Sequence, residues 1–102
     1  MYKIIIDKAL TRKLSVMRKR PRPVVVMLEK FLNELGQLED PRSRGKPLSA
    51  NLAGLWRYRI GDYRLFCDIQ DDKLIVVAFE FEHRSKAYDL KSLSKYLRYK
   101  RR

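Results

Sequence analysis

The chain has 102 residues, of which 45% are hydrophobic. That length is typical of one domain, and the hydrophobic content suffices for one modest core, so the high charge does not indicate disorder. Lys and Arg number 24 against 12 Asp and Glu, which gives a formal net charge of +12. Such a charge destabilises a fold by self-repulsion and favours a polyanion, because each neutralised phosphate releases a counterion. We expect residues 1–102 to form a single domain that binds RNA, with a membrane surface or an acidic protein as the alternative partners.

Cysteine content and hydropathy indicate the cellular compartment. Cys67 is the single cysteine in the sequence, which excludes an intramolecular disulfide and a cysteine-based zinc site. The apolar run within residues 1–7 is too short for a signal peptide, and no segment approaches the length of a membrane span. We therefore expect a cytoplasmic protein with no membrane partner.

The first half of the chain has the pattern of a strand followed by two helices. Residues 2–6 are rich in β-forming side chains, and Asp7 is a suitable N-cap for the helix that follows. The first helix carries an apolar stripe at i, i+4 and i+7, made of Leu10, Leu14 and Met17.

A second helix is expected to begin near two prolines. Pro21 and Pro23 end the first helix and help to start the next, which ends at Gly36. Its apolar side chains follow helical spacing, and they are Val24, Met27, Leu28, Phe31, Leu32 and Leu35. Two helices with so short a link indicate a helical hairpin.

The periodicity changes to that of strands in the second half. Residues 37–54 contain loop-forming Pro, Gly, Ser and Asn, with room for a short helical turn. Residues 55–60 alternate as in a strand, residues 61–62 have the composition of a two-residue hairpin turn, and residues 63–69 form the return strand.

A third strand and a basic tail complete the expected fold. A turn at residues 70–73 precedes a strand at residues 74–81, which is apolar on both faces and therefore expected to be central. Residues 90–102 are either a basic amphipathic helix or a frayed arm. We therefore predict an α+β domain: an N-terminal strand, a helical hairpin, an antiparallel β-meander with helices packed on one face, and a short C-terminal helix.

Three arginines are predicted to gather on one face of the hairpin. Strand alternation places Arg57 and Arg59 together, and a two-residue turn sets Arg59 opposite Arg64. Like charges directly opposite each other destabilise a sheet, so this placement is not explained by stability. Because guanidinium groups bind phosphate in a bidentate manner, we interpret the surface as a phosphate-binding platform. The alternative is a solvated strand face that is merely basic.

Three further candidates follow the third strand. His83 is the only histidine, and imidazole can transfer protons near neutral pH, although a lone histidine is more often structural. It precedes Arg84, and Tyr88 follows four residues after Arg84. Tyr88 can stack on a base or donate a hydrogen bond, and core packing is its alternative role.

Several segments resemble one toxin superfamily. Residues 54–64, with the sequence GLWRYRIGDYR, are similar to the central hairpin of the RelE/ParE toxin superfamily, and residues 83–88, HRSKAY, resemble its later motif. Asp40-Pro41-Arg42 and the following Gly45-Lys46-Pro47-Leu48 look like the loop before that hairpin. The resemblance covers about residues 2–89 and implies a RelE-like fold.

The resemblance implies a toxin of a type II toxin–antitoxin pair. RelE-like members cut mRNA in the ribosomal A site, where the ribose 2′-hydroxyl attacks the adjacent phosphate and no metal or other cofactor is needed. ParE-like members instead inhibit DNA gyrase. The implied partners are the ribosome, mRNA and a cognate antitoxin whose disordered segment folds on the toxin. The free toxin would be a monomer, and the complex a hetero-oligomer.

The same resemblance implies roles for individual residues. Positions 57 and 59 match lysines of RelE, and arginine there stays protonated, so neither is a ready general base. Arg64 and Arg84 match phosphate-stabilising arginines, and Tyr88 matches the aromatic that stacks on or orients the substrate. The general base stays open between His83 and a carboxylate such as Glu80 or Glu82, while dense positive charge could itself stabilise the transition state. A nonenzymatic RNA-binding domain is a third hypothesis.

Overall fold

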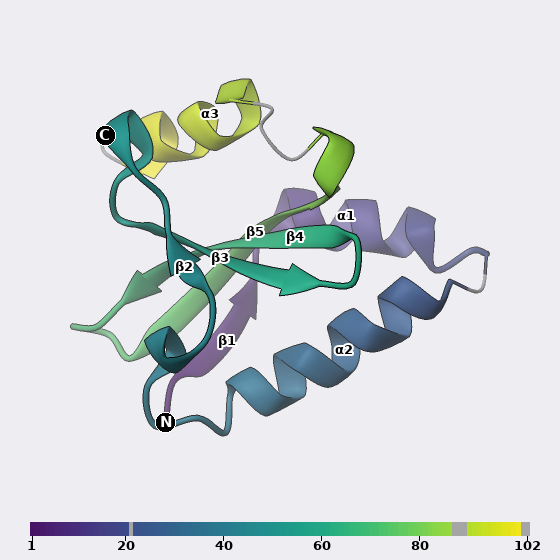
Figure 1. Cartoon of the computed structure of the whole chain (residues 1–102), viewed down its shortest axis with the longest axis horizontal. Helices are drawn as coiled ribbons and strands as arrows, with labels where there is room; N and C mark the ends of the chain where they lie inside the picture. The colour runs from purple at the N-terminus through teal and green to yellow at the C-terminus, as the bar shows by residue number, and fades with distance from the viewer. Residues whose placement is uncertain (21, 87–89, 101–102) are drawn as a thin grey trace.

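A mixed five-stranded sheet organises the molecule. The computed structural model describes residues 1–20, 22–86 and 90–100, in which the strand order is β1-β5-β4-β3-β2, with β1 parallel to β5 and the other pairs antiparallel (Figure 1). The strands are β1 (Lys3–Ile6), β2 (Lys46–Pro47), β3 (Leu55–Ile60), β4 (Tyr63–Gln70) and β5 (Ile75–His83). The helices are α1 (Lys8–Met17), α2 (Pro23–Leu35) and α3 (Leu90–Lys100), with 3-10 turns η1 (Pro41–Ser43), η2 (Ala50–Leu52) and η3 (Arg84–Lys86). The predicted α+β architecture is confirmed.

The first two helices begin where the sequence predicts. The Asp7 carboxylate caps α1 by accepting a hydrogen bond from the Ala9 backbone N–H at 3.2 Å, which satisfies one of the free amides of the first turn. Pro23 is the first residue of α2, where a missing N–H costs nothing. Pro21, the other proline of the predicted link, lies outside the described residues.

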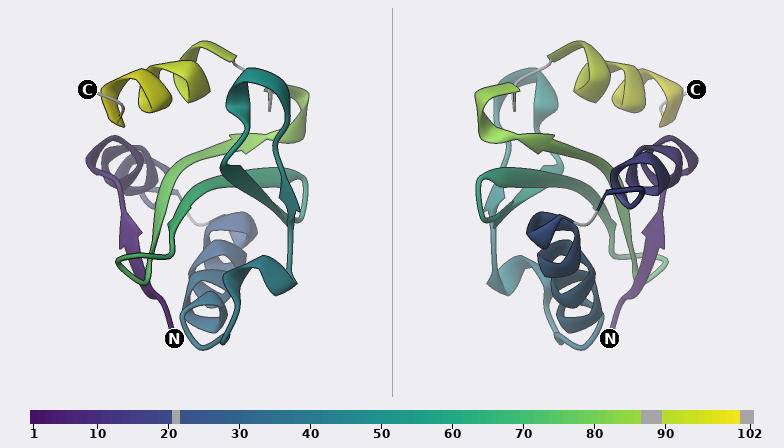
Figure 2. Two further views of the ribbon diagram at one scale, coloured as in Figure 1. Left: turned by 90° about the vertical axis from the view of Figure 1, so that its left-hand side faces the viewer. Right: turned by 90° about the vertical axis from the view of Figure 1, so that its right-hand side faces the viewer.

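The two faces of the sheet carry separate cores. Leu10 and Leu14 of α1 pack in one cluster with Leu28 and Leu35 of α2 and with side chains from β3, β4 and β5. The second cluster joins α3 and η2 to the other face, and its buried members are Leu52, Leu55, Phe66, Phe79 and Leu93. Figure 2 shows α2 and α3 on opposite sides of the sheet. The predicted packing on one face therefore describes α1 and α2, and α3 covers the other.

A stacked aromatic pair fixes α3, so residues 90–100 are a helix rather than an arm. The Tyr96 ring stacks on Phe79 with centroids 3.9 Å apart and planes 9° from parallel, and its hydroxyl donates to Asp68 at 3.0 Å. No helix within residues 1–20, 22–86 and 90–100 has both the length and the apolar character that crossing a membrane requires.

The third predicted strand is shifted by one residue at its start and extends further. Leu74 has a φ of +53° and is exposed in the turn, so β5 begins at Ile75 and continues to His83. This strand lies between β1 and β4, so it is internal to the sheet and hydrogen-bonded on both sides. Its end reaches the tip of the β3–β4 hairpin.

Candidate functional site

The β3–β4 hairpin brings three arginines to one face. Gly61 has a φ of +58°, a conformation that suits glycine in a tight turn, and the two-residue turn pairs Arg59 directly with Arg64. Arg57 lies two residues before Arg59 on the same strand, so its side chain leaves the same face. The geometry predicted for these three guanidinium groups is confirmed.

An open cleft of about 490 Å³ lies beside this hairpin. It is bounded by α2, by the loop that leads into β2, and by β3 and β4. The lining residues are Phe31, Arg44, Gly45, Lys46, Arg57, Tyr58, Arg59 and Arg64. Five of these eight are cations, and no acidic side chain is among the described residues that line the cleft. The cleft is therefore suited to an anion.

The loop at residues 44–46 adds two cations that sequence reasoning did not assign to the site. Gly45 has a φ of +80°, and a Cβ there would overlap the carbonyl oxygen of Arg57 and lie 2.7 Å from Trp56 Nε1. The Trp56 indole N–H donates to the Arg44 carbonyl at 2.7 Å, and Lys46 pairs with Arg57. This close approach places Arg44 and Lys46 at the cleft, and Gly45 is the residue in the sequence that permits it.

Arg64 has an unsatisfied donor. Within the described chain, its Nη1 is a buried side-chain nitrogen without a hydrogen-bond partner. Buried polar atoms are nearly always satisfied, so an orphaned guanidinium nitrogen in a cationic cleft indicates a place for an external acceptor. A phosphate oxygen is a matching acceptor.

His83 leaves the sheet on the opposite side from the arginines. It pairs with Tyr63, and the two rings meet edge to face with centroids 5.3 Å apart, whereas the neighbouring pair is Arg64 with Glu82. The backbone N–H of Ser85 donates to His83 Nδ1 at 3.1 Å. A neutral ring therefore carries its proton on Nε2. His83 is at the end of β5 and does not line the cleft.

Arg84 lies at the tip of the hairpin. Its backbone N–H donates to the Asp62 carbonyl at 2.7 Å, and its Nε is 3.8 Å from Asp62 Oδ1. Both side chains are more than half exposed, so this ion pair is weak and leaves the guanidinium accessible. Tyr88, the remaining candidate, lies outside the described residues.

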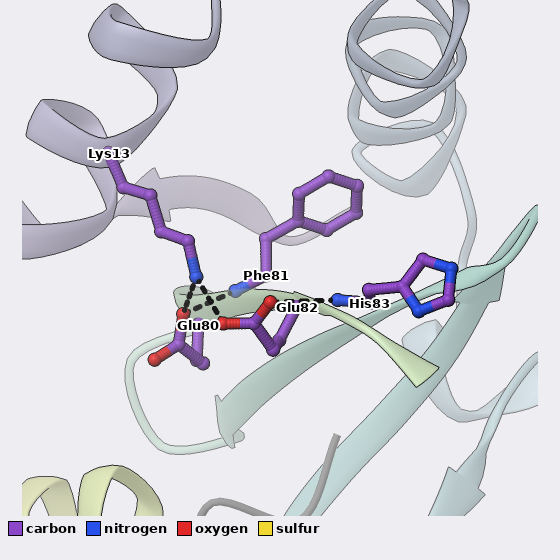
Figure 3. Close-up of polar contacts among 5 residues, drawn as sticks. All are labelled: Lys13, Glu80, Phe81, Glu82 and His83. Carbon is purple, nitrogen blue, oxygen red and sulfur yellow. Dashed lines mark hydrogen bonds and ion pairs between the residues drawn. The ribbon is translucent and has the colours of Figure 1, made fainter. Parts of the chain in front are cut away.

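The two glutamates considered as bases are both bound by Lys13. The Lys13 Nζ lies 2.9 Å from Glu80 Oε1 and 2.9 Å from Glu82 Oε2 (Figure 3). Burial raises the pKa of Glu82, but the hydrogen bonds from Lys13 and from the His83 backbone N–H outweigh it, so the pKa is lowered overall. Glu82 is therefore ionised at neutral pH and is a weak base.

Comparisons with known proteins agree on one family. Residues 8–88 match the family described as the ParE toxin of the type II toxin–antitoxin system parDE. The chain is also 35% identical to Toxin RelG of Mycobacterium tuberculosis over 68 residues, which are 67% of this chain and 76% of that protein. The chain therefore belongs to the RelE/ParE superfamily, and it is a toxin of a type II toxin–antitoxin system.

Solved structures show the same fold. The toxin–antitoxin complex RelBE2 of M. tuberculosis matches with a TM-score of 0.68 and 31% identity, over 81% of this chain and 98% of that one. A mutant of the E. coli toxin RelE in the free state matches with a TM-score of 0.66 and 17% identity, over 92% and 95% of the two chains. The predicted RelE-like fold is confirmed.

Proposed function

We propose that this toxin is a ribosome-dependent endoribonuclease that cuts mRNA in the A site. The observation that carries the proposal is the cleft in which Arg57, Arg59 and Arg64 share a face and Arg64 Nη1 lacks a partner. A cluster of permanently charged donors is matched to the scissile phosphate and to the charge that develops on it. The resemblance to RelE-like toxins supplies the reaction class.

In the proposed reaction the substrate supplies its own nucleophile. The ribose 2′-oxygen forms a bond to the adjacent phosphorus while the bond from phosphorus to the 5′-oxygen breaks, which leaves a cyclic phosphate and a 5′-hydroxyl. The 2′-hydroxyl loses a proton and the leaving oxygen gains one. Arg57, Arg59 and Arg64 stabilise the extra negative charge on the pentacoordinate phosphorus, and arginine cannot itself act as the base.

Proton transfer and substrate orientation are assigned to the last residue of β5 and to the residues that follow it. His83 is the proposed proton-transfer group, because an imidazole ring has one nitrogen that can accept a proton and one that can donate it. It lies outside the cleft, so the proposed role requires its ring to come within hydrogen-bond reach of the 2′-hydroxyl when mRNA is bound. Arg84, accessible at that tip, is the proposed further phosphate contact, and Tyr88 is proposed to stack on the base.

An antitoxin is the proposed protein partner. The M. tuberculosis relative of known structure was solved as a toxin–antitoxin complex. This chain carries a formal net charge of +12, which favours an acidic segment that folds on its surface. The expected genetic sign is a short gene for an acidic protein next to the gene for this toxin.

Primer extension on cellular mRNA after induction of the toxin tests the activity. Cuts that are phased with codons, and that disappear with Arg64→Ala at matched expression, support ribosome-dependent cleavage. The alternative is inhibition of DNA gyrase, which the match to the ParE toxin family favours. Growth arrest with a DNA-damage response and intact mRNA would identify that activity and contradict the nuclease.

A further inference from the structure

Lys13 holds two acidic side chains at the edge of the sheet. β1 pairs with β5 only as far as Ala78, so no strand of the described residues lies on that side of the last part of β5. Helix α1 contacts β5, and Lys13 reaches from it to Glu80 and Glu82, as Figure 3 shows. The three side chains are 35%, 22% and 28% exposed, so the cluster is shielded from much of the solvent.

Glu82 connects this cluster to the cleft, because it lies beside a cleft residue on the neighbouring strand. Glu82 is the direct partner of Arg64 across β4 and β5, and residues opposite each other share a face of the sheet. Opposite charges in such positions attract and normally pair. Among the described residues, however, no carboxylate forms an ion pair with Arg64, and Glu82 is bound to Lys13 instead.

We propose that Lys13 is a positioning residue that withholds Glu82 from Arg64 and thereby keeps the guanidinium available to phosphate. This inference rests on the proposed function of the cleft. Glu82 is doubly held, because its Oε2 accepts from Lys13 and its Oε1 accepts from the His83 backbone N–H at 3.0 Å. In Glu80 a single oxygen, Oε1, accepts from both Lys13 Nζ and the Phe81 backbone N–H, each at 2.9 Å. Without Lys13, Glu82 would turn to Arg64, its direct cross-strand partner on the same face.

A set of charge variants separates this role from simple loss of a positive charge. Lys13→Met removes the clamp while keeping side-chain length, and Lys8→Met removes one charge from an exposed position on the same helix. The readout is the Kd for a short fluorescently labelled single-stranded RNA at fixed, low salt. Lys13→Met should weaken RNA binding by about tenfold and Lys8→Met by about twofold or less. Each variant loses one positive charge, but only Lys13→Met also releases Glu82 to pair with Arg64.

Recovery of RNA affinity by a second substitution distinguishes the positioning role of Lys13 from a purely structural one. Glu82→Gln cannot neutralise Arg64, so Lys13→Met combined with Glu82→Gln should bind RNA within about twofold of Glu82→Gln alone. If Lys13→Met does not fold, the combination of Lys13→Met with Glu80→Gln and Glu82→Gln removes both acids of this cluster, and it should fold and bind. A purely structural role for Lys13 predicts no rescue of affinity in variants of equal thermal stability.

A spectroscopic readout tests the same step without RNA. The Nε–H resonance of Arg64 in 15N-labelled protein should shift in Lys13→Met, and it should return in the variant that also carries Glu82→Gln. Unchanged Arg64 resonances, or equal RNA affinities for Lys13→Met and Lys8→Met, would overturn the inference. Failure of the wild-type protein to bind RNA would instead contradict the proposed function.

Discussion

Arg59 and Arg64 lie directly opposite each other across the two-residue turn of the β3–β4 hairpin. Arg57 extends the same face, and Arg44 and Lys46 bring two more cations to the adjoining cleft. Like charges in this arrangement repel each other, so the fold tolerates a cost at the place where an anion is proposed to bind. Stability and the proposed binding of an anion therefore make opposite demands on this hairpin.

Replacing one member of the Arg59–Arg64 pair should stabilise the protein. Arg59→Thr removes the repulsion and introduces a good strand former, so the free energy of unfolding should rise by about 0.3–1 kcal/mol. The same variant should bind RNA more weakly. Urea unfolding measured beside an RNA titration checks both effects, and a less stable Arg59→Thr would show that the arginine contributes to folding.

The close approach of Gly45 to β3 should make this position intolerant of a side chain. Gly45→Ala places a Cβ against the Arg57 carbonyl and the Trp56 indole, and the φ of +80° adds backbone strain. We expect a loss of about 2–4 kcal/mol in the free energy of unfolding.

Gly54→Ala is the matched control for that variant. Gly54 has a φ of +100°, but nothing lies within 4 Å of the position that a Cβ would take, so only the conformational cost of about 1–2 kcal/mol applies. Chemical denaturation of both variants gives the comparison. Equal losses at the two positions would mean that the loop moves freely away from β3.

The Lys13–Glu82 contact should make stability depend on pH in the acid range. The folded-state pKa of Glu82 lies below its ordinary value of 4.5, so the unfolded chain binds more protons as the pH falls. The contribution is present above about pH 4.5 and is lost as the pH drops through the folded pKa. Burial lowers the pKa of Lys13, but its hydrogen bonds to Glu80 and Glu82 raise it overall, so its contribution is lost only in alkali.

Unfolding of Glu82→Gln at several pH values measures this dependence. The stability difference between wild type and Glu82→Gln should shrink as the pH falls below about 4.5, because the wild-type carboxylate becomes protonated first in the unfolded chain and then in the folded protein. Lys13→Met should also make the free energy of unfolding depend less on pH in the acid range. A difference that stays constant with pH would show that folding does not lower the pKa of Glu82.

His83 should affect catalysis without affecting affinity. His83→Gln keeps a polar side chain at the end of β5 but cannot transfer a proton, so cleavage of ribosome-bound mRNA should slow by about 10²–10⁴-fold. The Kd for RNA should stay within about twofold, because the ring does not line the cleft. Unaltered cleavage by this variant would leave electrostatic stabilisation as the main source of catalysis.

Local patterns in the sequence were sufficient to predict the hairpin and the helices. Alternation in residues 55–60 and the Gly61-Asp62 turn fixed the Arg59–Arg64 pairing, because register across a two-residue turn leaves no freedom. Strand β2 was missed, since two residues, Lys46 and Pro47, are too few to show a period. Its pairing depends on Gly45, whose role becomes visible only when β3 is in place.

The environment of the site depends on contacts that sequence patterns do not encode. Lys13 and Glu82 are 69 residues apart, and their contact requires β1 to pair in parallel with β5 and α1 to lie beside the end of β5. The sequence placed His83 correctly at a strand end, but its side of the sheet follows from the register of β5 with β4. A shift of one residue in that register would reverse the face of every side chain.

Single-turnover cleavage of mRNA on programmed ribosomes tests the central claim most directly. Wild-type toxin is compared with Arg64→Ala and with Arg18→Ala, a control whose guanidinium pairs with Glu29 on the exposed surface. Phosphate binding by the cleft predicts that Arg64→Ala slows cleavage by at least about a hundredfold, while Arg18→Ala cleaves within about twofold of wild type. Cleavage by folded Arg64→Ala at the wild-type rate would contradict the account.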